Sequence, residues 1–257
     1  MSFPASVSGR GYRLEVFETL GSTNDEAMAR AREDDPGRLW IRAVLQTGGK
    51  GRLGRRWVSP TGNLYASLLL LNAAMPDRAP ELGFVAGVAL ASTLAPLLGS
   101  RTLLKWPNDI VVNGAKLAGM LLEATQTKGG AFACVIGVGV NCASHPQGLP
   151  YAATDLASLG VAVTASDLLD SFAEELADRL DQWDEGRGFA QIRADWLTFA
   201  AGMGETAEVA MGDQRIKGVL RGLDERGRLL VDTEAGLRTI DAGDVFLPGL
   251  SEAAGQR

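Results

Sequence analysis

Short runs of apolar residues alternate with longer stretches of helical periodicity over the first two hundred residues of the chain. The runs predict six strands, at residues 12–19, 39–46, 64–71, 103–105, 116–124 and 132–140. A helix is expected after Ser22, which is a residue type that caps helix N-termini, and another over 166–183, where apolar residues recur at helical spacing. The uncharged segment 82–100 follows Pro80 and contains Pro96, so it predicts a helix that is buried in the core and does not span a membrane.

The pattern changes after residue 204. Five short alternating runs, at residues 206–211, 215–223, 228–233, 237–241 and 245–247, predict a small antiparallel barrel. A boundary at 202–204 gives a first domain of residues 1–203 and a second of residues 204–257. Because many strand connections in the first domain look like hairpins, the predicted class is α+β, with a mixed sheet and flanking helices rather than a doubly wound parallel sheet.

Composition excludes several kinds of chemistry. The net charge of −6 over 257 residues disfavours a general nucleic-acid binder. His145 is the single histidine, and Cys134 and Cys142 are the two cysteines, so the chain can build neither an HExxH nor a four-thiolate zinc site. Two cysteines in a chain of this size fit a reducing cytoplasm, and residues 1–20 lack the apolar core of a signal peptide. Lysine, arginine, aspartate, asparagine and backbone amides are left as the expected chemical groups.

The most informative stretch is 46–57, which is rich in glycine and contains four basic residues within seven positions. Residues 36–76 contain six basic residues and no carboxylate, which gives a local charge of +6 in an acidic protein. Glycines let the backbone approach a ligand closely, and arginine forks with backbone amides suit a phosphate or a carboxylate. Residues 49–54 match GxGxxG, but the sequence that follows is a poor helix former, so we interpret the match as coincidental. A solvated basic hairpin is the alternative interpretation.

A second cluster, Lys105-Trp106-Pro107-Asn108-Asp109, precedes Lys116 by a few residues. The turn signal Asn113-Gly114 predicts a hairpin that brings Lys116 back beside Asn108 and Asp109. The facing lysine and aspartate are either a structural ion pair or an electrophile-stabilising cation with a carboxylate for a metal or an amine. This segment alone leaves both interpretations open.

Taken in order, these motifs resemble those of biotin protein ligases. The matching segments are 22–24, 49–57, 105–109, 116–123 and 136–141, followed by a small C-terminal β domain, and the resemblance covers about residues 12–250. It is closer to the monofunctional type without an N-terminal DNA-binding domain, because only about 20 residues precede the first motif. The resemblance implies a class II synthetase-like catalytic domain followed by an SH3-like barrel.

The resemblance also implies an activity. Biotin protein ligases join the carboxylate of biotin to the α-phosphate of ATP and then transfer the biotinyl group to a lysine of an acceptor domain. The implied ligands are ATP, biotin and Mg²⁺, and the implied partner is the biotin carboxyl carrier domain of acetyl-CoA carboxylase or a related carboxylase. A cytoplasmic protein without a nucleic-acid or membrane partner is expected, and a homodimer, which is common in the family, is left open.

The resemblance also implies a role for each residue that matches a motif of the family. The expected catalytic residues are Lys116, Arg52 and Asp109, with Asp109 also expected to contact Mg²⁺. The expected biotin-binding residues are Ser22, Thr23, Asn24, Gln46, Lys50, Gly51, Arg52 and Lys116. The expected ATP-binding residues are Lys50, Arg52, Arg55, Trp57, Asn108, Lys116 and Asn141. The family has arginine or lysine at position 50, and lysine offers a point charge where arginine offers a planar fork.

Simpler roles and other functions compete with this interpretation. Ser22 could be only a helix cap, Trp57 a core tryptophan, and Asn141 a turn cap. A lipoate– or octanoate–protein ligase or transferase is the nearest rival function, but those families lack the 49–57 run. A non-catalytic biotin-responsive regulator is disfavoured, because the residues before Ser22 are too few for a winged helix. The cysteines are expected to be structural, and His145 is assigned no role.

Overall fold

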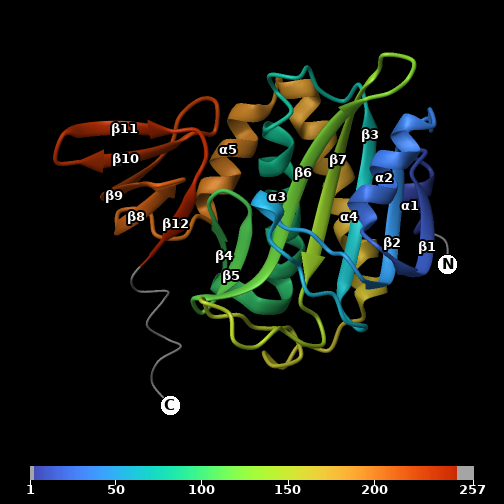
Figure 1. The fold of residues 1–257 in the computed structure, drawn as a ribbon, viewed down its shortest axis with the longest axis horizontal. Coiled ribbons are helices and arrows are strands. Elements are labelled where there is room, and N and C mark those ends of the chain that lie inside the picture. Colours follow the sequence, from blue (N-terminus) through green and yellow to red (C-terminus); the bar gives the residue numbers. More distant parts are fainter. Residues whose placement is uncertain (1–2, 248–257) are drawn as a thin grey trace.

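The larger of two sheets contains seven strands, in the order β1-β2-β3-β7-β6-β5-β4 (Figure 1). The computed structural model describes residues 3–247. The seven strands are β1 (Arg13–Leu20), β2 (Leu39–Gln46), β3 (Leu64–Leu71), β4 (Thr102–Lys105), β5 (Asp109–Val112), β6 (Ala115–Gln126) and β7 (Phe132–Val140). Strands β1 and β2 are parallel, whereas all other neighbours are antiparallel. The parallel pair arises because a helix connects β1 to β2 and returns the chain in the same direction.

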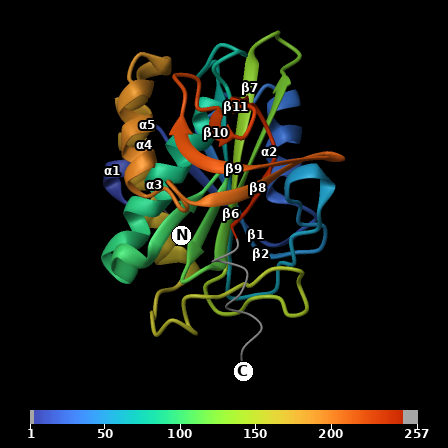
Figure 2. The ribbon, with the colours of Figure 1, turned by 90° about the vertical axis from the view of Figure 1, so that its left-hand side faces the viewer.

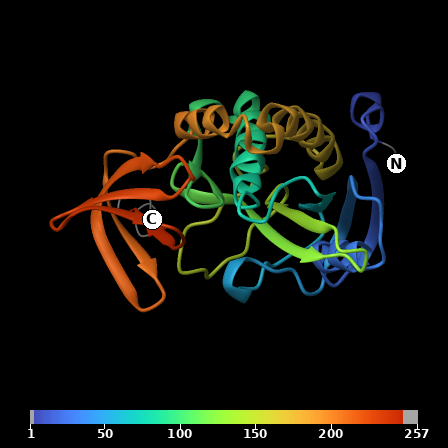
Figure 3. The same cartoon turned by 90° about the horizontal axis from the view of Figure 1, so that it is seen from above.

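Helices cover both faces of this sheet (Figure 3). The helices are α1 (Ala5–Ser8), α2 (Thr23–Arg32), α3 (Glu81–Leu98), α4 (Ala165–Trp183) and α5 (Phe189–Thr198). Helices α3, α4 and α5 lie on one face, and α2 lies on the other, where Ala27 and Ala31 pack into a separate apolar cluster with β2, β3 and β7. Ser22 caps α2 by accepting a hydrogen bond from the backbone nitrogen of Asp25 at 3.4 Å, as the sequence predicts.

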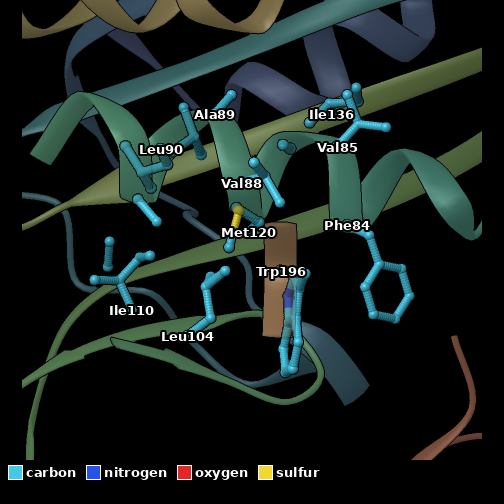
Figure 4. Packing of buried hydrophobic residues seen from close by; sticks show 14 of the residues in the cluster. Phe84, Val85, Val88, Ala89, Leu90, Leu104, Ile110, Met120, Ile136 and Trp196 are labelled. Carbon is cyan, nitrogen blue, oxygen red and sulfur yellow. The ribbon is translucent and has the colours of Figure 1, made fainter. Parts of the chain in front are cut away.

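Helix α3 is the buried helix that the sequence predicts. Together with the turn after it, residues Glu81–Arg101 are long and apolar enough to cross a membrane by length and composition alone, and 61% of the apolar window is buried inside the fold. Figure 4 shows how α3 packs against β4 to β7 and α5, with the labelled residues Phe84, Val85, Val88, Ala89, Leu90, Leu104, Ile110, Met120, Ile136 and Trp196. This packing makes α3 part of the main core.

The smaller sheet lies to one side of the larger one and is seen in front of it in Figure 2. Its strands are β8 (Thr206–Met211), β9 (Gln214–Leu223), β10 (Leu229–Thr233), β11 (Gly236–Ile240) and β12 (Asp244–Phe246). They are antiparallel in the order β11-β10-β9-β8-β12, with a register shift between β9 and β10 at Leu230/Val231. Trp106 Nε1 donates to the carbonyl oxygen of Gly227 at 3.3 Å, and this bond joins the smaller sheet to the β4–β5 turn.

The predicted class, an α+β fold with a mixed sheet and flanking helices, is confirmed. Every predicted strand is present, with ends that shift by at most a few residues, and the predicted hairpin at Asn113-Gly114 joins β5 to β6. The smaller sheet has the five predicted strands. Within residues 3–247, however, it is an open sheet with β11 and β12 at its edges, so closure into the predicted barrel is not confirmed. The end of the predicted second domain, after residue 247, lies outside the described residues.

Candidate active site

A cavity of about 330 Å³ lies where the N-terminal end of α2 meets the middle of β7, the β4–β5 turn and strand β12 of the smaller sheet. The predicted site residues on its wall are Ser22, Thr23, Asn24, Gln46, Lys50, Gly51, Arg52, Arg55, Trp57, Asn108, Asp109 and Lys116. They come from segments almost a hundred residues apart in the sequence. The fold therefore brings into one place the motifs that the sequence presents separately.

The end of the cavity at α2 is a buried polar network. Thr23 and Asn24 are each only 4% exposed. The side-chain oxygen of Gln46 accepts hydrogen bonds from the backbone nitrogen of Thr23 at 2.8 Å and from its hydroxyl at 3.2 Å. Ser67 Oγ donates to Asn24 Oδ1 at 2.6 Å, and Asn24 Nδ2 donates to Glu123 Oε2 at 2.7 Å. Because these bonds fix each side chain, the network can present its polar atoms to a ligand in one orientation.

Two glycines of β7 make room for site residues. A Cβ atom at Gly137 would lie 2.1 Å from Asn24 Oδ1, and one at Gly139 would lie 2.6 Å from Trp57 Nε1. Trp57 Nε1 is buried and has no hydrogen-bond partner among the described residues. The two glycines therefore let Asn24 and the indole ring lie directly against the sheet, and the indole nitrogen is left as a donor.

The cationic loop, residues 48–56, forms a small hairpin at the cavity. Backbone nitrogens of Gly51 and Trp57 donate to the carbonyl oxygens of Arg55 (2.7 Å) and Gly49 (2.9 Å). Arg52 NH1 lies 3.3 Å from Asn108 Oδ1, so the loop reaches the β4–β5 turn. A short 3₁₀ turn, Arg52–Gly54, lies within the GxGxxG match, and Arg55 directly after the match is extended where a dinucleotide fold would begin a helix, which supports the interpretation of the match as coincidental.

Lys116 lies at the centre of the site. Its Nζ is 2.6 Å from Asp109 Oδ1, as the predicted hairpin requires, and the two side chains are 20% and 16% exposed. The same Nζ lies 5.4 Å from the centre of the Trp57 ring and 5.7 Å from the centre of the Tyr151 ring. A half-buried cation between two aromatic rings and a carboxylate is well placed to stabilise negative charge that develops on a ligand.

Lys105 is a second lysine on the cavity wall. Its Cα pairs with that of Asp109 across β4 and β5. Burial lowers the pKa of Lys105 most strongly, and the nearby positive charge of Lys116 lowers it further, although Asp109 acts in the opposite direction. The sequence drew attention to the Lys105 motif without assigning this residue a role.

Asn141 is the predicted site residue that does not line the cavity. Its side chain is 3% exposed and donates to the carbonyl oxygen of Thr154 at 3.0 Å. The residue thus supports the segment after β7, whose backbone pairs with Lys116 at Ala152 and Thr154. Its position agrees better with the turn-capping alternative than with a direct contact to ATP.

His145 belongs to the same segment. Its Nδ1 lies 2.5 Å from Asp155 Oδ2, and Asp155 also accepts hydrogen bonds from the backbone nitrogen and hydroxyl of Ser158. Burial alone would raise the pKa of Asp155, but these hydrogen bonds outweigh it and lower the pKa. The histidine supports the segment that carries Tyr151 and lies outside the cavity wall.

The described residues show no group of three or more His, Cys, Asp or Glu side chains that could hold a metal ion. Asp109 remains a single carboxylate with Lys116 beside it. Both cysteines are free and buried, and burial raises the pKa of each thiol to about 11, so the structural interpretation of Cys134 and Cys142 is confirmed.

The side chains on the cavity wall that were not predicted as site residues include Lys105, Tyr151 and Asp244. Lys105 could have been found because it lies four residues before Asp109, a separation at which a tight hairpin places two residues opposite each other. Tyr151 lies in the connection after β7, and Asp244 directly precedes the predicted run 245–247; neither position marks a binding site in the sequence, so only the fold reveals them.

The arrangement can bind two kinds of group at once. The buried network at Thr23 and Asn24 suits a small ligand with fixed donors and acceptors, whereas Lys116 and the cationic loop suit a carboxylate and phosphates. A carboxylate and a phosphate held together at Lys116 would be in position to react with each other.

Comparison with known proteins identifies both parts of the chain. Residues 16–141 match the family described as "Biotin/lipoate A/B protein ligase family", and residues 203–247 match "Biotin protein ligase C terminal domain". The second match begins at the position where the sequence predicts a boundary.

Individual relatives agree with these matches. A biotin–[acetyl-CoA-carboxylase] ligase from Paracoccus denitrificans is 38% identical over 89% of this chain and 98% of its own length. The bifunctional ligase/repressor BirA of Escherichia coli is 30% identical over 92% of this chain and 74% of its own length. The structure of the biotin protein ligase from Aquifex aeolicus in complex with biotin and ATP has a TM-score of 0.78 at 27% identity, over 91% of this chain and 97% of that one. The motifs, the fold and these relatives together place the chain in the biotin protein ligase family.

Proposed function

We propose that the protein is an ATP-dependent ligase that activates biotin to biotinyl-5′-AMP and transfers biotin to a lysine of an acceptor domain. The observation that carries the proposal is the single cavity in which the polar network at α2, the cationic loop and the Lys116–Asp109 pair meet. The names of the Paracoccus and Aquifex relatives supply the identity of the ligands.

The two ends of the cavity take different substrates in this proposal. Biotin lies against Ser22, Thr23, Asn24, Gln46, Lys50, Gly51, Arg52 and Lys116, and ATP lies against Lys50, Arg52, Arg55, Trp57, Asn108 and Lys116. Asn141 acts on ATP indirectly, through the segment that it holds. The assignment is supported by the burial of the polar network, which suits a compact ring system, and by the positive charge of the loop, which suits phosphates.

In the first step, an oxygen of the biotin carboxylate attacks the α-phosphorus of ATP, and the bond to the leaving pyrophosphate breaks. Negative charge grows on the phosphate oxygens in this step. Lys116 and Arg52 are fixed near the reacting groups by Asp109 and Asn108, so they stabilise this charge without a large rearrangement. Neither a histidine nor a cysteine is needed, in agreement with the composition.

In the second step, the amine of the acceptor lysine attacks the carbonyl carbon of biotinyl-AMP, an amide bond forms, and AMP leaves. The attacking amine loses a proton. Asp109 is the carboxylate nearest to Lys116, and we assign to it the orientation and deprotonation of this amine. Lys116 then stabilises the charge on the carbonyl oxygen.

In this proposal, the Mg²⁺ that accompanies ATP would be held at Asp109. One carboxylate fits an ion that is held mainly by phosphate oxygens and water, because Mg²⁺ is commonly bound by one or two carboxylates together with substrate phosphates. Asp109, with Asn108 beside it, would supply that contact, and the positive charge of the ion would offset part of the negative charge of the phosphates.

The wider assignments follow from the same likeness. We propose that residues 1–203 form the catalytic domain and that residues 204–257 form an SH3-like barrel, supported by five short antiparallel strands and the register shift in β9–β10. The acceptor is the carrier domain of acetyl-CoA carboxylase or a related carboxylase, as the name of the Paracoccus relative indicates. The two buried free thiols support a cytoplasmic location.

The activation step tests this proposal directly. The purified chain is incubated with MgATP and either biotin, lipoate or octanoate, and the release of pyrophosphate and the mass of the adenylate are measured. Biotin should give biotinyl-AMP, and lipoate in excess should not compete. Adenylate formed from lipoate or octanoate but not from biotin would favour the other branch of the family and contradict the proposal.

A further inference from the structure

The cationic loop is held at the cavity by its charged side chains and not by apolar burial. None of the residues Arg52–Gly54 is buried, and Leu53 at the tip is 83% exposed. The backbone nitrogen of Gly48 donates to the carbonyl oxygen of Gly21 at 2.8 Å, which fixes the root of the loop. Beyond this root, charged side chains of the loop hold it at the cavity, through ion pairs with two aspartates and through hydrogen bonds from Arg52 to Asn108 and Gly243.

The first ion pair lies on the side of helix α2. Lys50 Nζ is 2.6 Å from Asp25 Oδ1, and the two side chains are 46% and 53% exposed. Asp25 lies in the first turn of α2, directly after Thr23 and Asn24 of the buried polar network. This contact brings Lys50 to the end of the cavity that is assigned to biotin.

The second contact lies on the side of the smaller sheet. Asp244, the first residue of β12, lies 3.0 Å from Arg55 NH2 and 3.5 Å from Arg52 NH1, and it is 30% exposed. Arg52 also donates to the carbonyl oxygen of Gly243 at 3.3 Å. The smaller sheet therefore holds the arginine that is assigned to the phosphates.

The charge balance explains why these carboxylates matter. The basic residues on the cavity wall are Lys50, Arg52, Arg55, Arg56, Lys105 and Lys116. The carboxylates on the same wall, among residues 3–247, are Asp109 and Asp244, and Asp109 is paired with Lys116. Before phosphates bind, Asp25 and Asp244 therefore offset the electrostatic repulsion between the cationic loop and the lysines outside it, Lys105 and Lys116.

We propose that Asp25 and Asp244 are positioning residues that hold the cationic loop across the cavity from two sides. The role of the loop in ligand binding rests on the proposed function, whereas the two contacts stand on the geometry alone. Because the Lys50–Asp25 pair is the more exposed, it is the weaker of the two. The loop therefore opens on the α2 side first and stays attached to β12.

Limited trypsin digestion of the full chain without ligands measures this restraint, since trypsin cuts after the loop residues Lys50, Arg52, Arg55 and Arg56. Mass spectrometry of the fragments gives the rate at each site. Asp25→Asn should raise the rate after Lys50 about twofold to fivefold, the range expected for an exposed ion pair. Asp244→Asn should raise the rate after Arg55 about tenfold, because two arginines lose a charged acceptor.

Matched variants separate positioning from general destabilisation. Asp25→Glu and Asp244→Glu keep the charge and should restore slow cleavage. Asp213→Asn makes the same change in the exposed β8–β9 turn and should leave the loop at the original rate. The proposal would be overturned if trypsin cut the loop of Asp25→Asn and Asp244→Asn no faster than the loop of Asp213→Asn. It would also be overturned if the two glutamate variants were cut as fast as the corresponding asparagine variants.

Salt provides a test without any substitution. Raising NaCl from 0.05 to 1 M screens ion pairs, so cleavage of the loop should accelerate relative to a free peptide of residues 46–58. An unchanged ratio would contradict the proposal. Biotin with MgATP should protect the loop in the original protein. Absence of that protection would count against the proposed function while leaving the result on Asp25 and Asp244 intact.

Discussion

Gly137→Ala tests whether close contact between β7 and Asn24 shapes the biotin end of the site. The added Cβ atom would lie 2.1 Å from Asn24 Oδ1, whereas ordinary contacts begin at 3.4 Å. Asn24 must therefore move by more than about 1 Å, since the glycine backbone is fixed in a central strand. The movement breaks its hydrogen bonds with Ser67 (2.6 Å) and Glu123 (2.7 Å).

The size of the effect follows from these contacts. Loss of two hydrogen bonds, one of them to a carboxylate, together with overpacking of a buried site, should lower the free energy of unfolding by about 2–4 kcal/mol. Affinity for biotin should fall by at least about tenfold, because Asn24 no longer presents its polar atoms in the same place. Urea denaturation and isothermal titration calorimetry measure the two quantities.

Two controls sharpen the result. Gly83→Ala, in α3, meets no atom within 4 Å and should stabilise the protein by about 0.4–1 kcal/mol. In an Asn24→Ala background, Gly137→Ala should cost less, with an interaction energy of about 1–2 kcal/mol. Two results would contradict a direct clash between Gly137→Ala and Asn24. One is a double variant in which the losses of unfolding free energy simply add, and the other is a Gly137→Ala protein with unchanged stability and biotin affinity.

Three other predictions follow from the site and its surroundings. Lys116→Ala should lower the rate of biotinyl-AMP formation by about 10²–10³-fold with little change in the melting temperature, measured by pyrophosphate release and calorimetry. Asp155→Asn should cost about 1–3 kcal/mol at pH 7 in urea denaturation. Because the pKa of Asp155 is lowered in the fold, this difference should persist above the unfolded pKa of 3.8 and shrink as the pH falls through the folded pKa; a pH-independent difference would contradict the assignment. Cys134 should resist iodoacetamide at pH 8 in the native protein and react in urea, and rapid native labelling detected by mass spectrometry would contradict its burial.

Much of the fold could be predicted because the ends of many strands are marked in the sequence by turn residues or by a change from apolar to polar residues. The run at 64–71 is apolar except for Ser67 and forms β3 with the predicted ends, and Asn113-Gly114 marks the β5–β6 hairpin. Helix α5 was not predicted, although its buried residues Phe189, Ile192 and Trp196 recur at helical spacing, since Gly188 before it provides no side-chain cap that would mark its start. The parallel pairing of β1 with β2 depends on the crossover through α2, and a strand pattern alone does not reveal the direction of a neighbour.

The site residues that could be predicted are those that lie in short, continuous sequence motifs. Lys116 and Asp109 are joined by a turn that the sequence shows, so their contact could be anticipated. Asn141 lies in a matching motif, but its side chain turns toward Thr154, a direction that depends on the later segment. Asp244 lies about 190 residues from the loop it contacts, and nothing local marks it.

In the proposed function, one cavity activates biotin and delivers it to a protein lysine. The most direct measurement is the intact mass of a purified carboxylase carrier domain after incubation with this chain, biotin and MgATP, with the modified residue located by peptide mass spectrometry. We expect one added biotinyl group on one lysine, dependent on ATP and lost with Lys116→Ala. An unmodified carrier domain in the presence of the folded, unaltered chain would contradict it.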